Sequence, residues 1–178
     1  MPTPVGHFTA GAGIVALAAR RVPASRALPV AAAVLFAANL PDLDYLAVVG
    51  GRAALERFHQ GPLHSLGFVA AAALALALPL RRRLSLAPAW LLLAAAGLTH
   101  LLLDLAVVDY KPPVGIPLFW PLSSERFHSP VEVFPGIDRV HLFSMRNLRE
   151  LLVELVLGLP VLLLALRAAR RAADAPAR

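Results

Sequence analysis

Five long apolar runs dominate this chain, at residues 5–19, 28–49, 63–80, 88–108 and 148–166. A helix needs about 20 apolar residues to cross the hydrocarbon layer of a membrane, and inside that layer every backbone polar group must be paired within the protein. Helices meet this requirement within one segment. The sequence therefore predicts an all-α polytopic membrane protein with about five membrane helices, of which the first is short for a full crossing.

The second run contains a break, within the segment NLPDLDYL at residues 39–46. Pro41 has no backbone N–H and its ring clashes with the preceding turn, so we expect a kink or a stop there. Broken backbone at membrane depth is tolerated where it lines a cavity inside the protein. The break is therefore predicted to present one or both carboxylates of Asp42 and Asp44 to such a cavity.

Composition narrows the class of protein further. Hydrophobic residues make up 58% of the chain and the mean hydropathy is +0.69, above the roughly 45–50% apolar content of soluble domains. The net charge of +6 comes from arginines in short clusters between the apolar runs, so no nucleic-acid partner is expected, because that would need a basic face or stripe. Without cysteine, any metal site must use His, Asp or Glu.

The arginine clusters predict the topology. They lie at residues 20–26, 81–83 and 167–178, and the positive-inside rule makes these places cytoplasmic. Alternation then puts the N-terminus and the irregular, proline-rich loop at 109–147 outside, where that loop forms a lid or lies at the membrane interface. We expect one membrane-embedded domain at 1–167, a basic cytoplasmic tail at 168–178, and residence in the cytoplasmic (inner) membrane of a bacterium or archaeon, in contact with membrane lipids.

Seven polar residues of the apolar runs and their borders fall on the predicted outer side. The arginine clusters that define the two sides include none of these seven residues. They are His7, Asp42, Asp44, His59, His64, His100 and Asp104. His100 and Asp104 are four apart on a helix and so share one face. A charged carboxylate near mid-bilayer costs roughly 2.5–3.5 kcal/mol, and a divalent cation would compensate it. All seven are predicted metal ligands, with Zn²⁺ preferred and Mn²⁺ or Fe²⁺ as alternatives.

Other interpretations of these residues stay open. His100 and Asp104 could simply form a hydrogen bond between turns, Asp42 could cap a short helix, and Asp104 could pair with Arg57. A proton relay would use the same residue types. Among the remaining polar residues, His128, His141, Glu132 and Asp138 are expected in the outer loop without a metal role. Glu150 and Glu154 are expected to pair with Arg146 and Arg149 at the outer interface, or else to face the cavity.

The ordered motifs HFTAG, NLPDLDYL, HQGPLHSL, THLLLDL and GIPLFWPLS, within residues 6–128, resemble the YdjM-type inner-membrane proteins, which are described as metal-dependent hydrolases. The chain departs from that pattern at Gln60 and Leu63, where the family has Arg and Thr, so an arginine for an anionic substrate is missing. The order of His and Asp residues is also more distantly similar to the zinc-dependent phospholipase C and P1 nuclease group. That likeness implies ligands at His7, Asp42 or Asp44, His59 or His64, His100 and Asp104.

The functional expectation is a membrane-bound hydrolase in which metal-activated water attacks a phosphoester, on a lipid or lipid-linked substrate, at the outer face. Asp42 or Asp44 would bridge metals or act as the general base, which makes them the predicted catalytic residues. The alternative is a protein that binds a metal for transport or sensing without hydrolysis. A third possibility is a structural protein whose polar residues only hold helices together.

Overall fold

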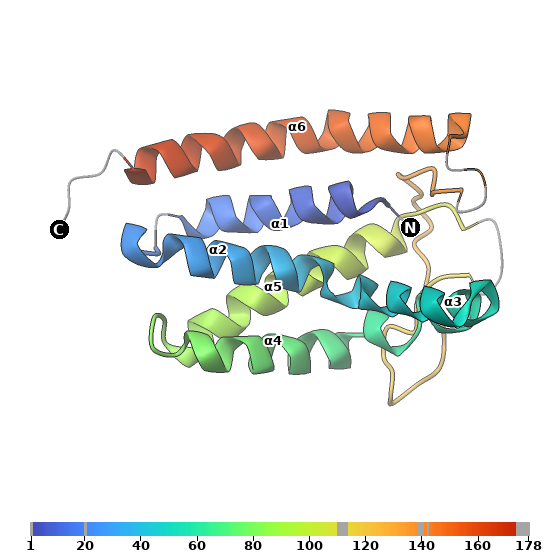
Figure 1. Cartoon of the computed structure of the whole chain (residues 1–178), viewed down its shortest axis with the longest axis horizontal. Coiled ribbons are helices and arrows are strands. Elements are labelled where there is room, and N and C mark those ends of the chain that lie inside the picture. Colours follow the sequence, from blue (N-terminus) through green and yellow to red (C-terminus); the bar gives the residue numbers. More distant parts are fainter. Residues whose placement is uncertain (1, 20, 110–113, 139–140, 142, 174–178) are drawn as a thin grey trace.

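The computed structural model describes residues 2–19, 21–109, 114–138, 141 and 143–173. Helices account for 70% of the structure, and the described residues form six α-helices and no β-strand. The protein is an all-α membrane protein, as predicted. Figure 1 shows long helices running side by side, with the N-terminus, α3 and residues 114–138 at one end of the bundle and the C-terminal end of α6 at the other.

The first and last helices of the chain pack against each other. Helix α1 (Pro4–Ala18) begins at Thr3, whose side chain accepts a hydrogen bond from the backbone N–H of Val5, and α6 (Met145–Ala173) lies alongside it (Figure 1). A Cβ atom at Gly158 of α6 would lie 2.7 Å from the Thr9 side chain of α1. Small residues at this contact let the two backbones approach closely, as is usual between helices in membranes.

The predicted break at Pro41 is confirmed. Helix α2 (Ala24–Asn39) ends two residues before the proline, and the chain continues as a 3₁₀ helix, η1 (Leu40–Gly50). Together Ser25–Gly50 forms one apolar span of 26 residues. The short helix α3 (Arg52–Phe58) then runs beside η1 and returns the chain toward the bundle (Figure 1).

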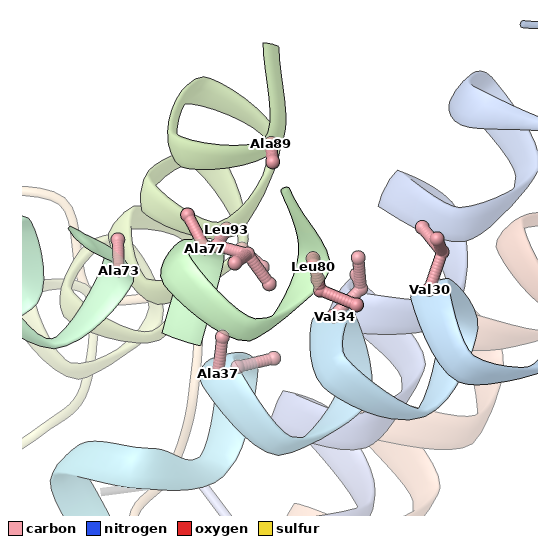
Figure 2. Packing of buried hydrophobic residues seen from close by; sticks show 10 residues of the cluster. Val30, Val34, Ala37, Ala73, Ala77, Leu80, Ala89 and Leu93 are labelled. Atoms are coloured by element: carbon pink, nitrogen blue, oxygen red, sulfur yellow. The ribbon is translucent and has the colours of Figure 1, made fainter. Parts of the chain in front are cut away.

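Helices α4 and α5 form the other half of the bundle. A short 3₁₀ turn, η2 (Pro62–His64), leads into α4 (Leu66–Leu80), and α5 (Leu86–Leu105) returns antiparallel to it. Their buried faces meet α2 in an apolar core dominated by small residues, among them Ala37, Ala73, Ala77 and Ala89, with Val34 and Leu93 between them (Figure 2). This core fills the bundle between α2, α4 and α5.

The five predicted apolar runs all correspond to helical segments, but not all of these segments are long enough to cross a membrane. Three described segments are long and apolar enough to cross a membrane, at Ser25–Gly50, Leu86–Leu105 and Met145–Arg171. A bent pair, Ala53–His64 with Leu66–Leu80, makes a fourth if it counts as one span, and α1 is shorter at 15 residues. Helix α6 continues into the predicted basic tail as far as Ala173, whereas 174–178, like Arg20, lie outside the described residues.

The outer loop is irregular, as predicted, and its described part is tied to the ends of the helices. The backbone N–H of Ser129 donates to the Leu105 carbonyl, that of Val108 to the Phe134 carbonyl, and that of Leu66 to the Leu118 carbonyl. The Arg126 guanidinium also donates to the Gln60 carbonyl, at 2.9 Å. The loop is therefore held over the end of the bundle where α5 ends and α4 begins.

Close packing between α4 and α5 gives a test of the fold. A Cβ atom at Gly97 would lie 2.7 Å from Cγ1 of the buried, stiff Val69 side chain, so Gly97→Leu should destabilise the protein by about 1–3 kcal/mol through overpacking. We expect a lower midpoint of thermal unfolding in detergent. Leu102→Ala, at a position that is 56% exposed on the same helix, is the control and should change the midpoint little. Equal midpoints for the wild type and Gly97→Leu would contradict this packing.

Candidate metal centre

All seven predicted ligands converge at the end of the bundle that carries the outer loop. His7 comes from the first turns of α1, Asp42 and Asp44 from η1, and His100 and Asp104 from the last turns of α5, while His59 directly follows α3 and His64 ends η2. Six of them are buried and Asp42 is partly buried. The arginine-bearing connections, α1 to α2 and α4 to α5, lie at the opposite end of the bundle (Figure 1). The fold thus places the seven His and Asp residues and these arginine-bearing connections at opposite ends of the bundle, as the sequence predicted.

Four atoms form the centre of this cluster: His64 Nε2, His100 Nε2, Asp104 Oδ2 and Asp42 Oδ1. The two imidazole nitrogens are 3.3 Å apart, and Asp104 Oδ2 lies 3.1 Å from that of His64 and 3.3 Å from that of His100. Asp42 Oδ1 lies 3.6 Å from each of the same nitrogens. These five separations, one between the two nitrogens and four between a nitrogen and a carboxylate oxygen, fall between 3.1 and 3.6 Å.

This spacing can be compared with that of zinc ligands. Nitrogen and oxygen atoms placed about 2.0–2.1 Å from a zinc ion, at the corners of a tetrahedron, lie roughly 3.3–3.4 Å from one another. The separations among His64 Nε2, His100 Nε2 and Asp104 Oδ2 are 3.1–3.3 Å, close to that value, and Asp42 Oδ1 lies slightly farther, at 3.6 Å, from the two nitrogens. Two histidine nitrogens and two carboxylate oxygens are also a donor set that suits zinc and other first-row divalent metals. His64, His100 and Asp104 could therefore hold such an ion, with Asp42 beside the same two histidine nitrogens.

The orientation of His100 follows from the break in α2. Its Nδ1 donates a hydrogen bond to the Ala38 carbonyl at 2.9 Å, with the other ring nitrogen, Nε2, facing the cluster. In a 3₁₀ turn the N–H of residue 41 would reach this carbonyl, but Pro41 has none. The carbonyl is therefore left to His100, and a hydrogen bond of this kind fixes which nitrogen can bind a metal.

Asp44 lies behind the four atoms. Its Oδ1 is 2.7 Å from His59 Nδ1, and its Oδ2 accepts the backbone N–H of Gln60 at 3.0 Å. The same oxygen is 3.2 Å from His64 Nδ1, the ring nitrogen that points away from the cluster. The backbone at His64 is also held in place, because the next residue, Ser65, caps α4 by accepting the N–H of Phe68. Asp44 is thus placed to orient both histidines.

His7 completes the cluster from α1. Its ring stacks on that of His100, with centroids 3.7 Å apart and planes 16° from parallel. Its Nε2 is 3.6 Å from Asp104 Oδ1. The side chain is fully buried, and neither ring nitrogen has a hydrogen-bond partner among the described residues.

The buried polar atoms of this cluster are of a kind that could bind a metal ion. Six side-chain atoms of the cluster are buried without a well-oriented hydrogen bond in the described structure, namely both nitrogens of His7, both oxygens of Asp42 and both oxygens of Asp104, and His64 Nδ1 has only the 3.2 Å contact with Asp44. Leaving so many buried polar atoms unpaired is costly in any protein and more so within a membrane. The ligand atoms of the seven candidate residues fall into three overlapping groups, and within each group the atoms lie within 4.8 Å of one another. The groups are His7, Asp42 and His100; His64, His100 and Asp104; and Asp42, Asp44 and His59.

Two alternatives left open by the sequence find no counterpart in the described contacts. Asp42 lies inside η1, whose first residue is Leu40, so it does not occupy a helix cap. Asp104 is fully buried, whereas Arg57 is exposed and its guanidinium lies over the Phe58 ring at 5.6 Å. The alternative pairing of Asp104 with Arg57 is therefore not observed among the described contacts.

The remaining polar residues lie partly as expected. His128 Nε2 is 2.7 Å from the Val107 carbonyl and 3.5 Å from Glu132, and His141 contacts Asp138, all outside the cluster. The favoured pairing of Glu150 and Glu154 with Arg146 and Arg149 is wrong, because both carboxylates point inward. Glu150 accepts the Gly136 N–H at 2.8 Å and Glu154 accepts from Thr3, whereas Arg146 contacts Asp138 at 3.1 Å.

Sequence reasoning missed three contributors to this region. The Ala38 carbonyl and the Gln60 N–H are backbone groups, and Thr3 lies before the first apolar run. Among these, only the Ala38 carbonyl could have been predicted. Pro41 has no N–H, so the carbonyl three residues before it lacks its usual donor.

Comparison with known protein families gives a match over nearly the whole chain. The family model described as YdjM inner membrane protein matches residues 1–173, nearly the whole chain, so the chain belongs to this family. No curated protein and no solved structure matches it.

The role of Pro41 is testable. Pro41→Ala restores an N–H that competes with His100 for the Ala38 carbonyl, so His100 should lose its fixed orientation. We expect affinity for zinc to fall by about 10–100-fold, the usual effect of removing such a supporting group, as measured by competition with a coloured chelator. Pro29→Ala, inside the other end of α2, is the matched control and should bind like the wild type. Unchanged affinity in Pro41→Ala would show that the break does not orient this histidine.

Proposed function

We propose that this member of the YdjM inner membrane protein family is a metal-dependent hydrolase that cleaves a phosphoester of a lipid or lipid-linked substrate. The observation that carries the proposal is the convergence of Asp42, His64, His100 and Asp104, in which one oxygen of each carboxylate lies 3.1–3.6 Å from both histidine Nε2 atoms. A role in helix packing alone would be expected to join buried polar groups by well-oriented hydrogen bonds, whereas the oxygens of Asp42 and Asp104 lie 3.1–3.6 Å from histidine nitrogens without forming one in the described structure.

The proposed roles follow from position. Asp42, His64, His100 and Asp104 hold the cation, and His7 is an additional ligand beside them. Asp44 orients His64 and His59 rather than binding directly. When bound, a divalent cation supplies Lewis-acid chemistry, making a nearby water more acidic and stabilising charge on the oxygens of a phosphoester.

Asp42 is the carboxylate best placed to meet substrate. Its side chain is 11% exposed, against 4% for Asp44 and 0% for Asp104, so it is the least buried of the three carboxylates, although its two oxygens are themselves covered. Its Oδ1 faces the two histidines, which leaves Oδ2 to receive a proton from the attacking water. Of the two predicted catalytic residues, Asp42 is therefore assigned the role of general base and Asp44 the role of positioning residue.

The location of the cluster supports a lipid substrate. The residues of η1 belong to an apolar span, and exposed apolar side chains such as Leu43 and Leu46 flank the two aspartates. A substrate whose reactive group lies at the membrane surface could reach this depth without leaving the lipid. The positive-inside rule places this end of the bundle outside and the C-terminus in the cytoplasm.

Transport is less well supported. The buried residues that form the core between α2, α4 and α5 are all apolar, including Val30, Ala77 and Leu80 (Figure 2). An ion crossing the bundle would need polar groups along its path, and the described core between these helices offers none.

The first experiment measures metal and hydrolysis together. Protein purified in detergent should contain stoichiometric zinc, manganese or iron by elemental mass spectrometry, and should hydrolyse phosphatidic acid or a soluble phosphomonoester. Chelation should abolish hydrolysis and re-addition of the metal should restore it. The His100→Ala/Asp104→Ala double variant should lose both metal and activity, whereas His141→Ala, an exposed loop residue, should keep both.

The outcomes separate the hypotheses. Metal without hydrolysis of any phosphoester, together with metal-dependent flux in liposomes, would favour transport over the proposed enzyme. Absence of metal from a folded wild type, even after reconstitution, would overturn the metal centre itself.

A further inference from the structure

Helix α6 carries a second set of buried acidic groups, away from the metal centre. Glu150 is fully buried and Glu154 is 3% exposed, on a helix whose surface is otherwise largely open. Carboxylates are rarely placed inside a membrane protein without a specific partner. The partners of Glu154 are on α1: the backbone N–H and the hydroxyl of Thr3 each donate to one of its two oxygens.

This contact closes the N-terminal end of α1. A helix begins with backbone N–H groups that have no partner within the helix, and a carboxylate placed there is also stabilised by the helix dipole. No acidic residue lies in the first turn of α1 itself. Glu154 supplies the missing carboxylate from a neighbouring helix, and the Thr3 hydroxyl that it fixes in turn accepts the N–H of Val5 at 3.1 Å.

The contact is one turn from a candidate ligand. The Thr3 carbonyl accepts the backbone N–H groups of Gly6 and His7, at 3.0 and 3.4 Å. A Cβ atom at Gly6 would lie 2.8 Å from Glu154 Oε1, so the absence of a side chain at Gly6 lets the carboxylate approach the turn. The position of Thr3 therefore sets the backbone from which His7 projects.

His7 has little else to hold it in place. Its two ring nitrogens have no hydrogen-bond partner in the described structure, and its contacts within the cluster are the stack on His100 and the approach to Asp104. Two of the other histidines are oriented by hydrogen bonds, His100 by the Ala38 carbonyl and His59 by Asp44. For His7 the corresponding support is the clamp formed by Glu154 and Thr3 on the first turn of α1.

We propose that Glu154 is a positioning residue, which holds the first turn of α1 through Thr3 and thereby places His7 at the metal centre. The inference rests on the proposed function to the extent that His7 is a metal ligand. It assigns α6 a task beyond packing, namely to fix one ligand of the centre from outside the cluster.

The test uses full-length protein in detergent, titrated with cobalt(II), whose visible spectrum reports the number and type of its ligands. Glu154→Gln and Thr3→Val should each give the spectrum of His7→Ala and weaken cobalt binding by about tenfold. Thr3→Ser keeps the hydroxyl and should behave like the wild type. Arg149→Gln, an exposed position on α6, is the matched control for substitutions on that helix.

A double-variant cycle separates positioning from general loss of structure. If Glu154 acts through His7, Glu154→Gln should weaken cobalt binding in the wild type and have no further effect in the His7→Ala background. Equal losses in both backgrounds, or an unchanged spectrum in Glu154→Gln and Thr3→Val, would overturn the proposal. Failure of the wild type itself to bind cobalt would instead overturn the proposed metal centre, so the two failures are distinguishable.

Discussion

The inability of Pro41 to donate a backbone hydrogen bond underlies most of the site. It ends α2 at Asn39, tightens the following residues into a 3₁₀ helix and frees the Ala38 carbonyl for His100. The tighter winding of η1 also brings Asp42 and Asp44, two residues apart, to different parts of one cluster. Asp42 faces the two histidine nitrogens, and Asp44 faces His59 and the Gln60 N–H. A regular helix would have continued the apolar span without this division of roles.

The energetics of burial explain why so many groups gather at one place. Each carboxylate at membrane depth costs roughly 2.5–3.5 kcal/mol on insertion scales, and Asp104 has no exposed surface at all. Grouping three carboxylates would make this worse by mutual repulsion unless positive charge lies among them. Histidines supply donors for Asp44, whereas the oxygens of Asp42 and Asp104 lie near histidine nitrogens without a well-oriented hydrogen bond in the described structure. A cation is the partner that would balance both the charge and the unpaired atoms.

Much of this arrangement is predictable from sequence because it rests on simple periodicities. The apolar runs give the helices, the four-residue spacing gives the shared face of His100 and Asp104, and the arginine clusters separate the two ends of the bundle. The roles within the cluster are not predictable, because Asp42 and Asp44 differ only in the path of the backbone after Pro41. Glu150 and Glu154 were misassigned for a similar reason. Nearby arginines make a surface pairing plausible in sequence, whereas their actual partners, Gly136 and Thr3, are distant along the chain.

Helix α6 contributes to the structure in a different way from the helices that form the core. Helices α2, α4 and α5 share the apolar core, whereas α6 packs mainly on α1 and leaves most of its surface exposed. A helix attached to one neighbour by small residues alone could slide along it, since membrane helices gain little from apolar contact with each other. The buried carboxylates remove that freedom. Glu154 fixes α6 to the start of α1, and Glu150, four residues earlier, fixes it to Gly136 in the outer loop. Helix α6 thus joins the N-terminus and the loop at the end of the bundle where the candidate ligands meet.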